Sequence, residues 1–265
     1  MAKLSASFEF IGPISNLSAY RMRGVDGIIL RKKGGASKSV IKRSYKFELT
    51  RKANAEFGGR SAAGKWARAV LHRQKPLADY NISGPINALL LAAQKMDTVN
   101  LFGKRNVLLS KIPWLLDGFS LNRTTPFDSI IRTPLLYTIS RNELSAHIEI
   151  PQLRPGINFH TKEKHPFYSL VVSLGIVPDL FFSRDDYRPS SKKYKQDDAA
   201  VVDTSWYPVL QGSEAISLDM KYRGTPPDQS FTLLLSIGIR FGTMPDGKTV
   251  QGVPYAGAAK ILVGG

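Results

Sequence analysis

The chain changes character near residue 125, and this change limits the folds that it can adopt. From Lys38 to about Lys75, Ala, Arg and Lys are frequent and few β-branched residues follow Ile41, which favours helix. After about Phe127, short apolar segments alternate with turn residues, which is typical of strands. We therefore expect an α+β chain: a basic, mainly helical region with short N-terminal strands at 1–125, and a β-sandwich domain at 126–265.

The second region is expected to be an antiparallel β-sandwich of the immunoglobulin or fibronectin type. Turn sequences such as Pro155-Gly156 separate its apolar segments, and the spacing suits about seven short strands. The Cys–Trp–Cys signature of true immunoglobulin domains is absent, because the chain has no cysteine. The polar segment Arg184–Asp203 is expected to be a long mobile loop. The strand-like segments are 147–150, 168–177, 180–182, 215–220, 231–241 and 261–263.

Within the first region, one helix is clearly marked. Ser83-Gly84-Pro85 is a start signal, since proline is tolerated in the first turn of a helix. Apolar residues then recur at helical spacing, at Ile86, Leu89, Leu90, Ala93 and Met96. Short strands are expected earlier, at Phe8–Ile11 and Val25–Leu30, and the segment 117–128 is the best candidate for a boundary between the two regions.

Positive charge is concentrated in the first half of the chain. Sixteen of the 37 basic residues fall between Arg21 and Lys75, where only Asp26, Glu48 and Glu56 oppose them. The net charge of the whole chain is +16, and residues 111–265 contribute only 17 basic minus 15 acidic residues, or +2. This asymmetry indicates a polyanionic partner: nucleic acid, an anionic surface or an acidic protein.

The candidate contacts lie in a turn and along the expected helix. Lys65, Arg68, His72 and Lys75 are spaced by three, four and three residues, which would place them on one helical face that follows a phosphate backbone. The alternative is a solvated basic helix, and the aromatic residues interleaved with the charge are more simply core residues. The expected nucleic-acid-binding residues are Arg31, Lys32, Lys33, Arg51, Lys52, Arg60, Lys65, Arg68 and Lys75.

One segment imitates a nucleotide-binding motif. Gly59 to Lys65 fits the pattern G-x-x-x-x-G-K, in which backbone amides hold phosphates. The next residue should be Ser or Thr to hold magnesium, but it is Trp66, and no buried strand precedes the motif. The more economical interpretation is a basic helix interrupted by glycines.

Other chemistry finds little support in the sequence. Without cysteine, thiolate catalysis and cysteine-ligated metal sites are excluded, and His160 and His165 lack the spacing of a zinc motif. We recognise no catalytic motif and expect no enzyme, cofactor or metal. No apolar stretch is long enough to span a membrane, and no secretory signal is evident, so a cytoplasmic location is the default expectation.

Three stretches carry a family resemblance: Asn54–Gly58 with its basic flanks, Leu77–Pro85, and Tyr255–Leu262. Together they resemble a family of uncharacterised conserved proteins from Bacteroidetes-type bacteria, along most of the chain. The resemblance implies a basic N-terminal module followed by a β-rich half, and it implies no activity and no functional residue.

These observations lead to two functional hypotheses. The first is a non-enzymatic protein that binds a polyanion, most simply nucleic acid without sequence preference, through its basic N-terminal half. The alternative is a structural protein that assembles with copies of itself through open sandwich edges, with Phe8–Ile11 as an added strand and charge complementarity between copies.

Overall fold

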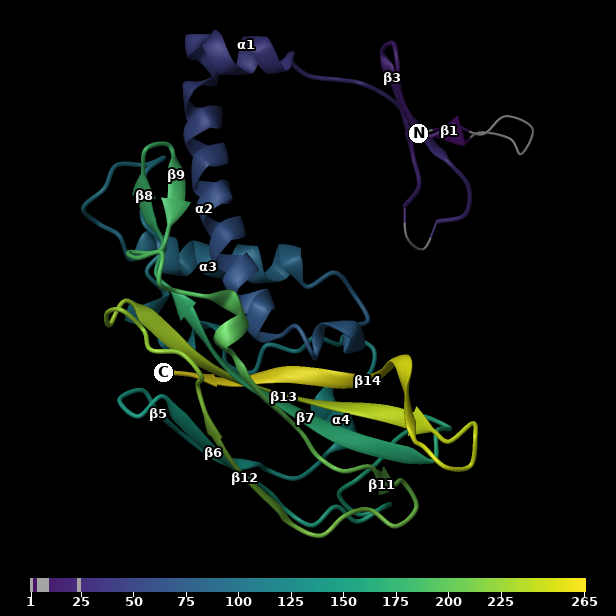
Figure 1. Ribbon diagram of the computed structural model, residues 1–265. Helices are drawn as coiled ribbons and strands as arrows, with labels where there is room; N and C mark the ends of the chain where they lie inside the picture. The colour runs from purple at the N-terminus through teal and green to yellow at the C-terminus, as the bar shows by residue number, and fades with distance from the viewer. Residues whose placement is uncertain (1, 4–9, 23–24) are drawn as a thin grey trace. The chain divides into compact units, whose positions relative to one another are not determined.

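The computed structural model describes residues 2–3, 10–22 and 25–265, as a mixed α+β chain whose sheets are all antiparallel (Figure 1). It divides into two compact units, Met1–Arg51 and Lys52–Gly265. The division lies well before residue 125, because residues on both sides of 125 pack into one hydrophobic cluster.

The Met1–Arg51 unit has a small sheet and short helices, with few buried side chains. Among its described residues, the buried apolar ones are Ala19, Ile28 and Ile29. The expected strand at 25–30 begins later, at Ile29, and the expected strand at Phe8–Ile11 lies partly outside the described residues. The sheet has the order β1-β4-β3-β2. Its elements are β1 (Ala2–Lys3), β2 (Gly12–Ile14), β3 (Leu17–Tyr20), β4 (Ile29–Lys32), α1 (Lys38–Arg43), η1 (Tyr45–Phe47) and the start of α2 (Glu48–Val70).

The helix expected after Ser83 is present in the Lys52–Gly265 unit. Helix α3 (Ser83–Lys95) begins at the predicted signal, and Ile86, Leu90 and Ala93 are fully buried. Leu89 and Met96, from the same apolar stripe, are each 38% exposed. Around Pro113 the chain forms short 3-10 turns. The shorter elements are η2 (Lys75–Leu77), η3 (Leu109–Lys111), η4 (Pro113–Leu116) and α4 (Phe127–Ile130).

Two antiparallel sheets and a hairpin make up the β-rich part. The larger sheet has the order β10-β7-β13-β14, with β11 also paired to β7, and the smaller has the order β12-β6-β5. The strands are β5 (Leu136–Ser140), β6 (Ser145–Ile150), β7 (Phe167–Pro178), β8 (Phe181–Ser183), β9 (Asp186–Arg188), β10 (Ala200–Asp203), β11 (Tyr207–Pro208), β12 (Ile216–Lys221), β13 (Phe231–Thr243) and β14 (Gln251–Gly264).

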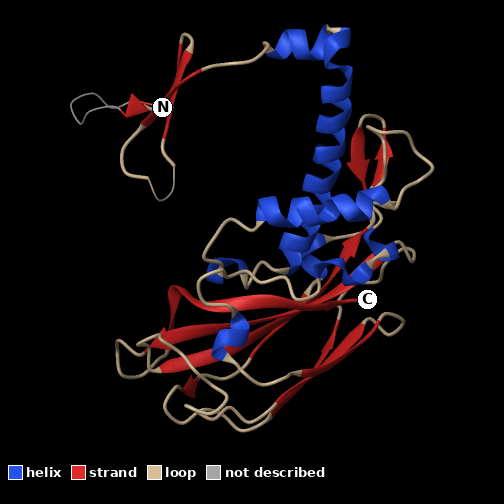
Figure 2. Ribbon diagram, turned by 180° about the vertical axis from the view of Figure 1, so that it is seen from behind, coloured by secondary structure: helices blue, strands red, loops and turns tan. Residues whose placement is uncertain are grey.

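The larger sheet is the middle of three layers (Figure 2). Alternate residues of β7 point to opposite sides: Leu170 and Val172 join the small sheet's Ile148 in one cluster, while Val171 joins residues of α2 and α3 in another. Burial on both faces explains why β7 is almost continuously apolar, whereas β6, with one face in solvent, alternates.

The segment expected to be a mobile loop is largely ordered, which corrects that interpretation. Arg184–Asp203 contains β9, the turn η5 (Gln196–Asp198) and β10, and Tyr187 and Tyr194 within it are buried. The ring of Tyr194 packs edge-on against Trp66 of α2, with 6.5 Å between ring centroids. These two aromatic residues anchor a segment whose charge suggested a solvated loop.

The outer edge of β14 is covered around residues 259–261 by the segment 117–122, in the stretch expected to be a boundary. Leu121 N–H donates to the carbonyl of Ala259, and Ile261 N–H donates to that of Phe119. The side chain of Asn122 completes the cover: its Oδ1 accepts from Ala259 N–H at 2.9 Å, and its Nδ2 donates to Leu77 O at 2.7 Å. A covered edge cannot pair with another chain.

We predict that Asn122→Ala destabilises the protein by about 2 kcal/mol, because the substitution leaves a buried amide and a buried carbonyl without partners. Urea unfolding followed by circular dichroism measures the change. Asn142→Ala, at an exposed turn position, is the matched control and should leave the midpoint unchanged. Equal midpoints for both variants would contradict the role given to Asn122.

Candidate polyanion-binding surface

The basic side chains of the Met1–Arg51 unit are mostly exposed. Arg31 and Lys32 lie at the end of β4 and are exposed, and Lys33, in the turn that follows, donates to the carbonyl of Ser15 at 3.0 Å. Ser37 caps the N-terminus of helix α1, and its hydroxyl accepts from Val40 N–H. Among the described residues, the following are exposed and have no ion-pair partner: Arg31, Lys32, Lys38, Lys42, Arg43 and Lys46.

Arg51 has a different position from these residues. Its side chain is partly buried, and Nη1 donates to the carbonyls of Ile41 and Ser44, each at 2.7 Å. The last carbonyls of a short helix lack partners within that helix, so the guanidinium serves as a cap for α1. Arg51 is therefore a structural residue of this unit, with its donors directed at the backbone.

In the Lys52–Gly265 unit, Lys65 and Lys75 are exposed, but they do not share one helical face. Helix α2 ends at Val70, so His72 lies in a turn and Lys75 in the following 3-10 helix. The expected stripe from Lys65 to Lys75 is therefore wrong as a helical face. The apolar residues Leu71 and Leu77 are buried and hold this segment against the core.

The other basic candidates of this unit are partly buried. Arg60 donates to Gln94 Oε1 at 3.2 Å and lies over the ring of Phe57 at 5.7 Å. Lys52 packs against Gly103, and Arg68 has its Nη1 buried, which lowers the pKa of its guanidinium. Burial against neighbours leaves these three side chains less free to reach a phosphate than Lys65 or Lys75.

The motif that imitates a phosphate loop is the middle of helix α2. Residues 59–65 are helical, so their amides are already used within the helix and do not form a cradle. The two glycines have packing roles instead. A Cβ at Gly59 would lie 2.6 Å from a ring carbon of Tyr187, and one at Gly64 would lie 2.2 Å from Asn87 Oδ1. The glycines thus allow close approach of the helix to its neighbours.

A buried ion pair, which the sequence analysis did not identify, lies beside this helix. Glu56 is 1% exposed, and Arg105 donates to its two carboxylate oxygens, each at 2.6 Å. Gly103 N–H donates to the same carboxylate at 3.0 Å, and Gln94 Nε2 donates to the Glu56 carbonyl at 3.2 Å. Burial would raise the pKa of Glu56, but these donors outweigh it and hold the pKa below its usual value.

The sequence contains a signal for some of the residues that were not expected. The densest basic stretch includes Lys38, Lys42, Arg43 and Lys46, so the charge count alone could have placed them among the candidates. Glu56 and Arg105 are 49 positions apart, and nothing in a single sequence pairs them. Their buried pair becomes visible only once α2 and the segment after α3 are side by side.

No group of His, Asp or Glu in the described chain is arranged to hold a metal ion. None of the described helices is long and apolar enough to cross a membrane. No family model, curated protein or solved structure matches the chain. Function must therefore be inferred from the geometry and charge of the residues themselves.

We predict that Glu56→Gln lowers the free energy of unfolding by about 3 kcal/mol at neutral pH, because Arg105 loses a buried partner. The folded pKa of Glu56 lies below its unfolded value near 4.5, so its stabilising effect is present above that value and is lost as the pH falls through the folded pKa. The wild type and the variant should therefore converge in acid. Denaturant unfolding over a pH series measures this difference.

The control is Glu214→Gln, which removes an exposed carboxylate of the same unit. This variant should unfold with nearly the same free energy as the wild type. A Glu56→Gln variant as stable as the control at neutral pH would show that the ion pair contributes nothing.

Proposed function

We propose that the protein is a non-enzymatic polyanion-binding protein, and that its most suitable partner is nucleic acid bound without sequence preference. The basic residues would contact phosphates, which supply affinity but carry no sequence information. A cytoplasmic location, where nucleic acid is accessible, belongs to the same proposal.

The observation that carries the proposal is the set of exposed, unpaired cations in the Met1–Arg51 unit. Arg31, Lys32 and the cations of α1 and η1 have no ion-pair partner among the described residues, so their positive charge is available to a ligand. The unit also has few buried apolar side chains, so its charged side chains do little to complete a core. Exposed cations close together in sequence are suited to a chain of phosphates.

The nine residues expected from the sequence do not contribute equally to this proposal. Arg31, Lys32 and Lys33, together with the added cations of α1 and η1, are its main contacts in the Met1–Arg51 unit. Lys65 and Lys75 are available in the other unit. Arg51, Lys52, Arg60 and Arg68 keep a secondary place, because each is engaged with or buried against the protein itself.

We predict that the wild type binds duplex DNA with a strong dependence on salt. Neutralising about six phosphates gives a slope of about −5 in a plot of log affinity against log salt concentration. The double variant Lys42→Glu/Arg43→Glu should bind about tenfold or more weakly and with a shallower slope. Fluorescence anisotropy of a labelled duplex at several salt concentrations measures both quantities.

The matched control is Lys192→Glu/Lys193→Glu, which makes the same charge change at two exposed lysines of the Lys52–Gly265 unit. It should retain most of the affinity. Equal loss of affinity in both double variants would show that only the net charge matters. An affinity that does not depend on salt concentration would contradict the proposal.

A second candidate function is self-assembly, which uncovered strand edges favour. The small sheet ends on β5 and β12, and β6 is the only described strand that pairs with either of them. Leu136 on β5 is 62% exposed. The outer face of this sheet is also acidic around His147, which contacts Asp219 at 2.7 Å and Glu149 at 3.3 Å. An open edge beside carboxylates offers pairing and charge complementarity to a basic copy.

Light scattering without nucleic acid distinguishes the two functions. Assembly predicts a mass that rises with protein concentration, and Leu136→Lys should abolish the rise, because a lysine on an edge strand opposes pairing. A protein that stays monomeric at every concentration would exclude this second function.

We also propose that residues 126–265 form a sandwich of the fibronectin type III kind. Apart from the β8–β9 hairpin and the two-residue β11, the first, second and fifth strands (β5, β6 and β12) form one sheet, and the third, fourth, sixth and seventh (β7, β10, β13 and β14) form the other. In the immunoglobulin constant type, the fourth strand joins the first sheet. The strand order therefore favours the fibronectin arrangement, with helices added over one face.

A further inference from the structure

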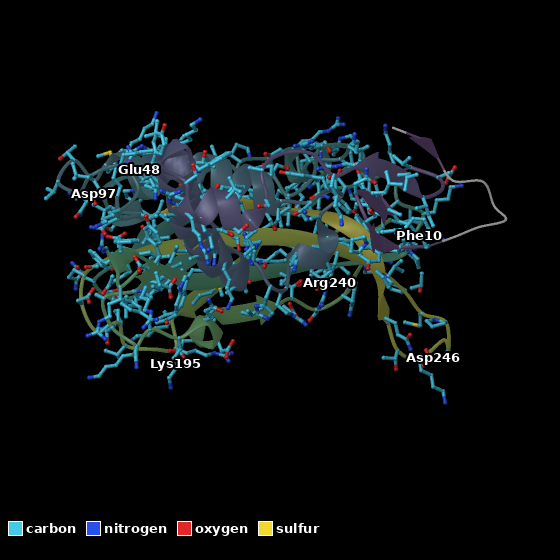
Figure 3. All side chains as sticks on the ribbon, turned by 90° about the horizontal axis from the view of Figure 1, so that it is seen from above. Phe10, Glu48, Asp97, Lys195, Arg240 and Asp246 are labelled. Carbon is cyan, nitrogen blue, oxygen red and sulfur yellow. The ribbon has the colours of Figure 1, made fainter. Side chains whose placement is uncertain are left out.

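The loop that follows helix α3 is held rigidly while its apolar side chains face solvent. This segment, Asp97 to Arg105, is called the Asp97–Arg105 loop below. Figure 1 shows it projecting beside the β8–β9 hairpin, and Asn106 Oδ1 accepts from Phe182 N–H of that hairpin at 2.9 Å. In Figure 3, Asp97 lies at the opposite end of the Lys52–Gly265 unit from Asp246, in the β13–β14 turn.

Two buried carboxylates fix the two ends of this loop. Asp97 accepts from the amides of Val99 and Asn100, each at 3.0 Å, and from Asn106 N–H at 2.7 Å. These donors outweigh burial and hold the pKa of Asp97 below its usual value. At the other end, Glu56 binds Gly103 and Arg105. The loop therefore has one defined shape through polar contacts on its inner side.

Gly103 also helps to fix the shape of the Asp97–Arg105 loop. Its φ of +98° is in the left-handed region that favours glycine, and a Cβ there would lie 2.7 Å from the Lys52 side chain and 3.1 Å from its Cα. The loop thus needs glycine at this position to lie flat on α2. Because the inner side of the loop packs closely on α2, no space remains beneath the loop for its outer side chains.

The outer side of the loop is apolar and cationic. Val99 is 89% exposed and Leu101 is 82% exposed, and Phe102 beside them is 43% exposed. Lys95 and Lys104 are exposed at the two flanks. Asp97 is the only acidic residue from Lys95 to Arg105, and it is buried. Exposure of the apolar tip to water is unfavourable, and the lysines on its two flanks attract negative charge.

We propose that the Asp97–Arg105 loop docks on an anionic lipid bilayer. The apolar tip enters the boundary between headgroups and acyl chains, while Lys95 and Lys104 lie at the level of the lipid phosphates. Nucleic acid suits this site less well, because the two most exposed tip residues, Val99 and Leu101, are aliphatic, and Arg105 already lies over the ring of Phe102 at 5.4 Å. The inference is independent of the proposed nucleic-acid binding, since none of the proposed nucleic-acid contacts lies in the Asp97–Arg105 loop.

The test uses the full chain and flotation with vesicles of mixed phosphatidylcholine and phosphatidylglycerol. The variant Leu101→Ser/Phe102→Ser removes two apolar side chains from the tip. Its partition onto these vesicles should fall by about tenfold or more, because each large apolar side chain contributes strongly to transfer from water. The control Ile157→Ser/Leu210→Ser changes two residues that are 70% and 90% exposed elsewhere in the same unit, and it should bind like the wild type.

A second readout reports insertion directly. A Phe102→Trp variant should show a blue shift and an increase of its tryptophan emission on anionic vesicles, relative to the same spectra of the wild type with its three native tryptophans. Attachment through the Met1–Arg51 cations alone would leave this emission unchanged, and binding would then vanish at high salt.

Three results would overturn the inference: no binding of the wild type to anionic vesicles, equal binding of the tip variant and the control, or no change in the emission of the Phe102→Trp variant beyond that of the wild type. Because Lys42→Glu/Arg43→Glu tests nucleic-acid binding separately, either proposal can fail while the other stands.

Discussion

Burial of β7 and β13 on both faces is the constraint on which the rest of the structure depends. One face of these strands packs on the small sheet and the other packs on α2 and α3. Without β7 and β13, neither the helices nor the small sheet would have a hydrophobic surface to pack against. This arrangement orders the elements around a single middle layer, and it explains why the helices before residue 125 belong with the strands after it. A strand with two buried faces can carry few charges, so charge is displaced to the periphery.

The same constraint separates structural cations from available ones. Within the Lys52–Gly265 unit, basic residues packed between elements are engaged: Arg240 of β13 pairs with Asp203 at 3.3 Å, and Arg105 pairs with Glu56. In the Met1–Arg51 unit, the described cations of α1 are exposed and the buried apolar side chains are few. A small unit with little core gains little stability from its own burial, so contact with a partner has more to contribute there.

The sequence predicts local structure well where one periodicity prevails. The start of α3 at Ser83 and the strands β6, β7, β12 and β13 are near their expected positions, because each pattern reflects a constant environment. The segment Arg184–Asp203 differs from its expected form because two buried tyrosines, Tyr187 and Tyr194, outweigh its many charges. Among the candidate contacts, exposure of Lys65 follows from charge, but the capping role of Arg51 depends on backbone carbonyls that no residue pattern reveals.

The close approach of Tyr187 to helix α2 has a consequence for how this protein can change over time. The tyrosine ring occupies the space that any side chain at position 59 would need. A larger residue at 59 is therefore tolerated only together with a smaller one at 187, so the two positions should covary among relatives. Substitution at either position is therefore restricted by the residue at the other, although the two positions are 128 apart in the sequence.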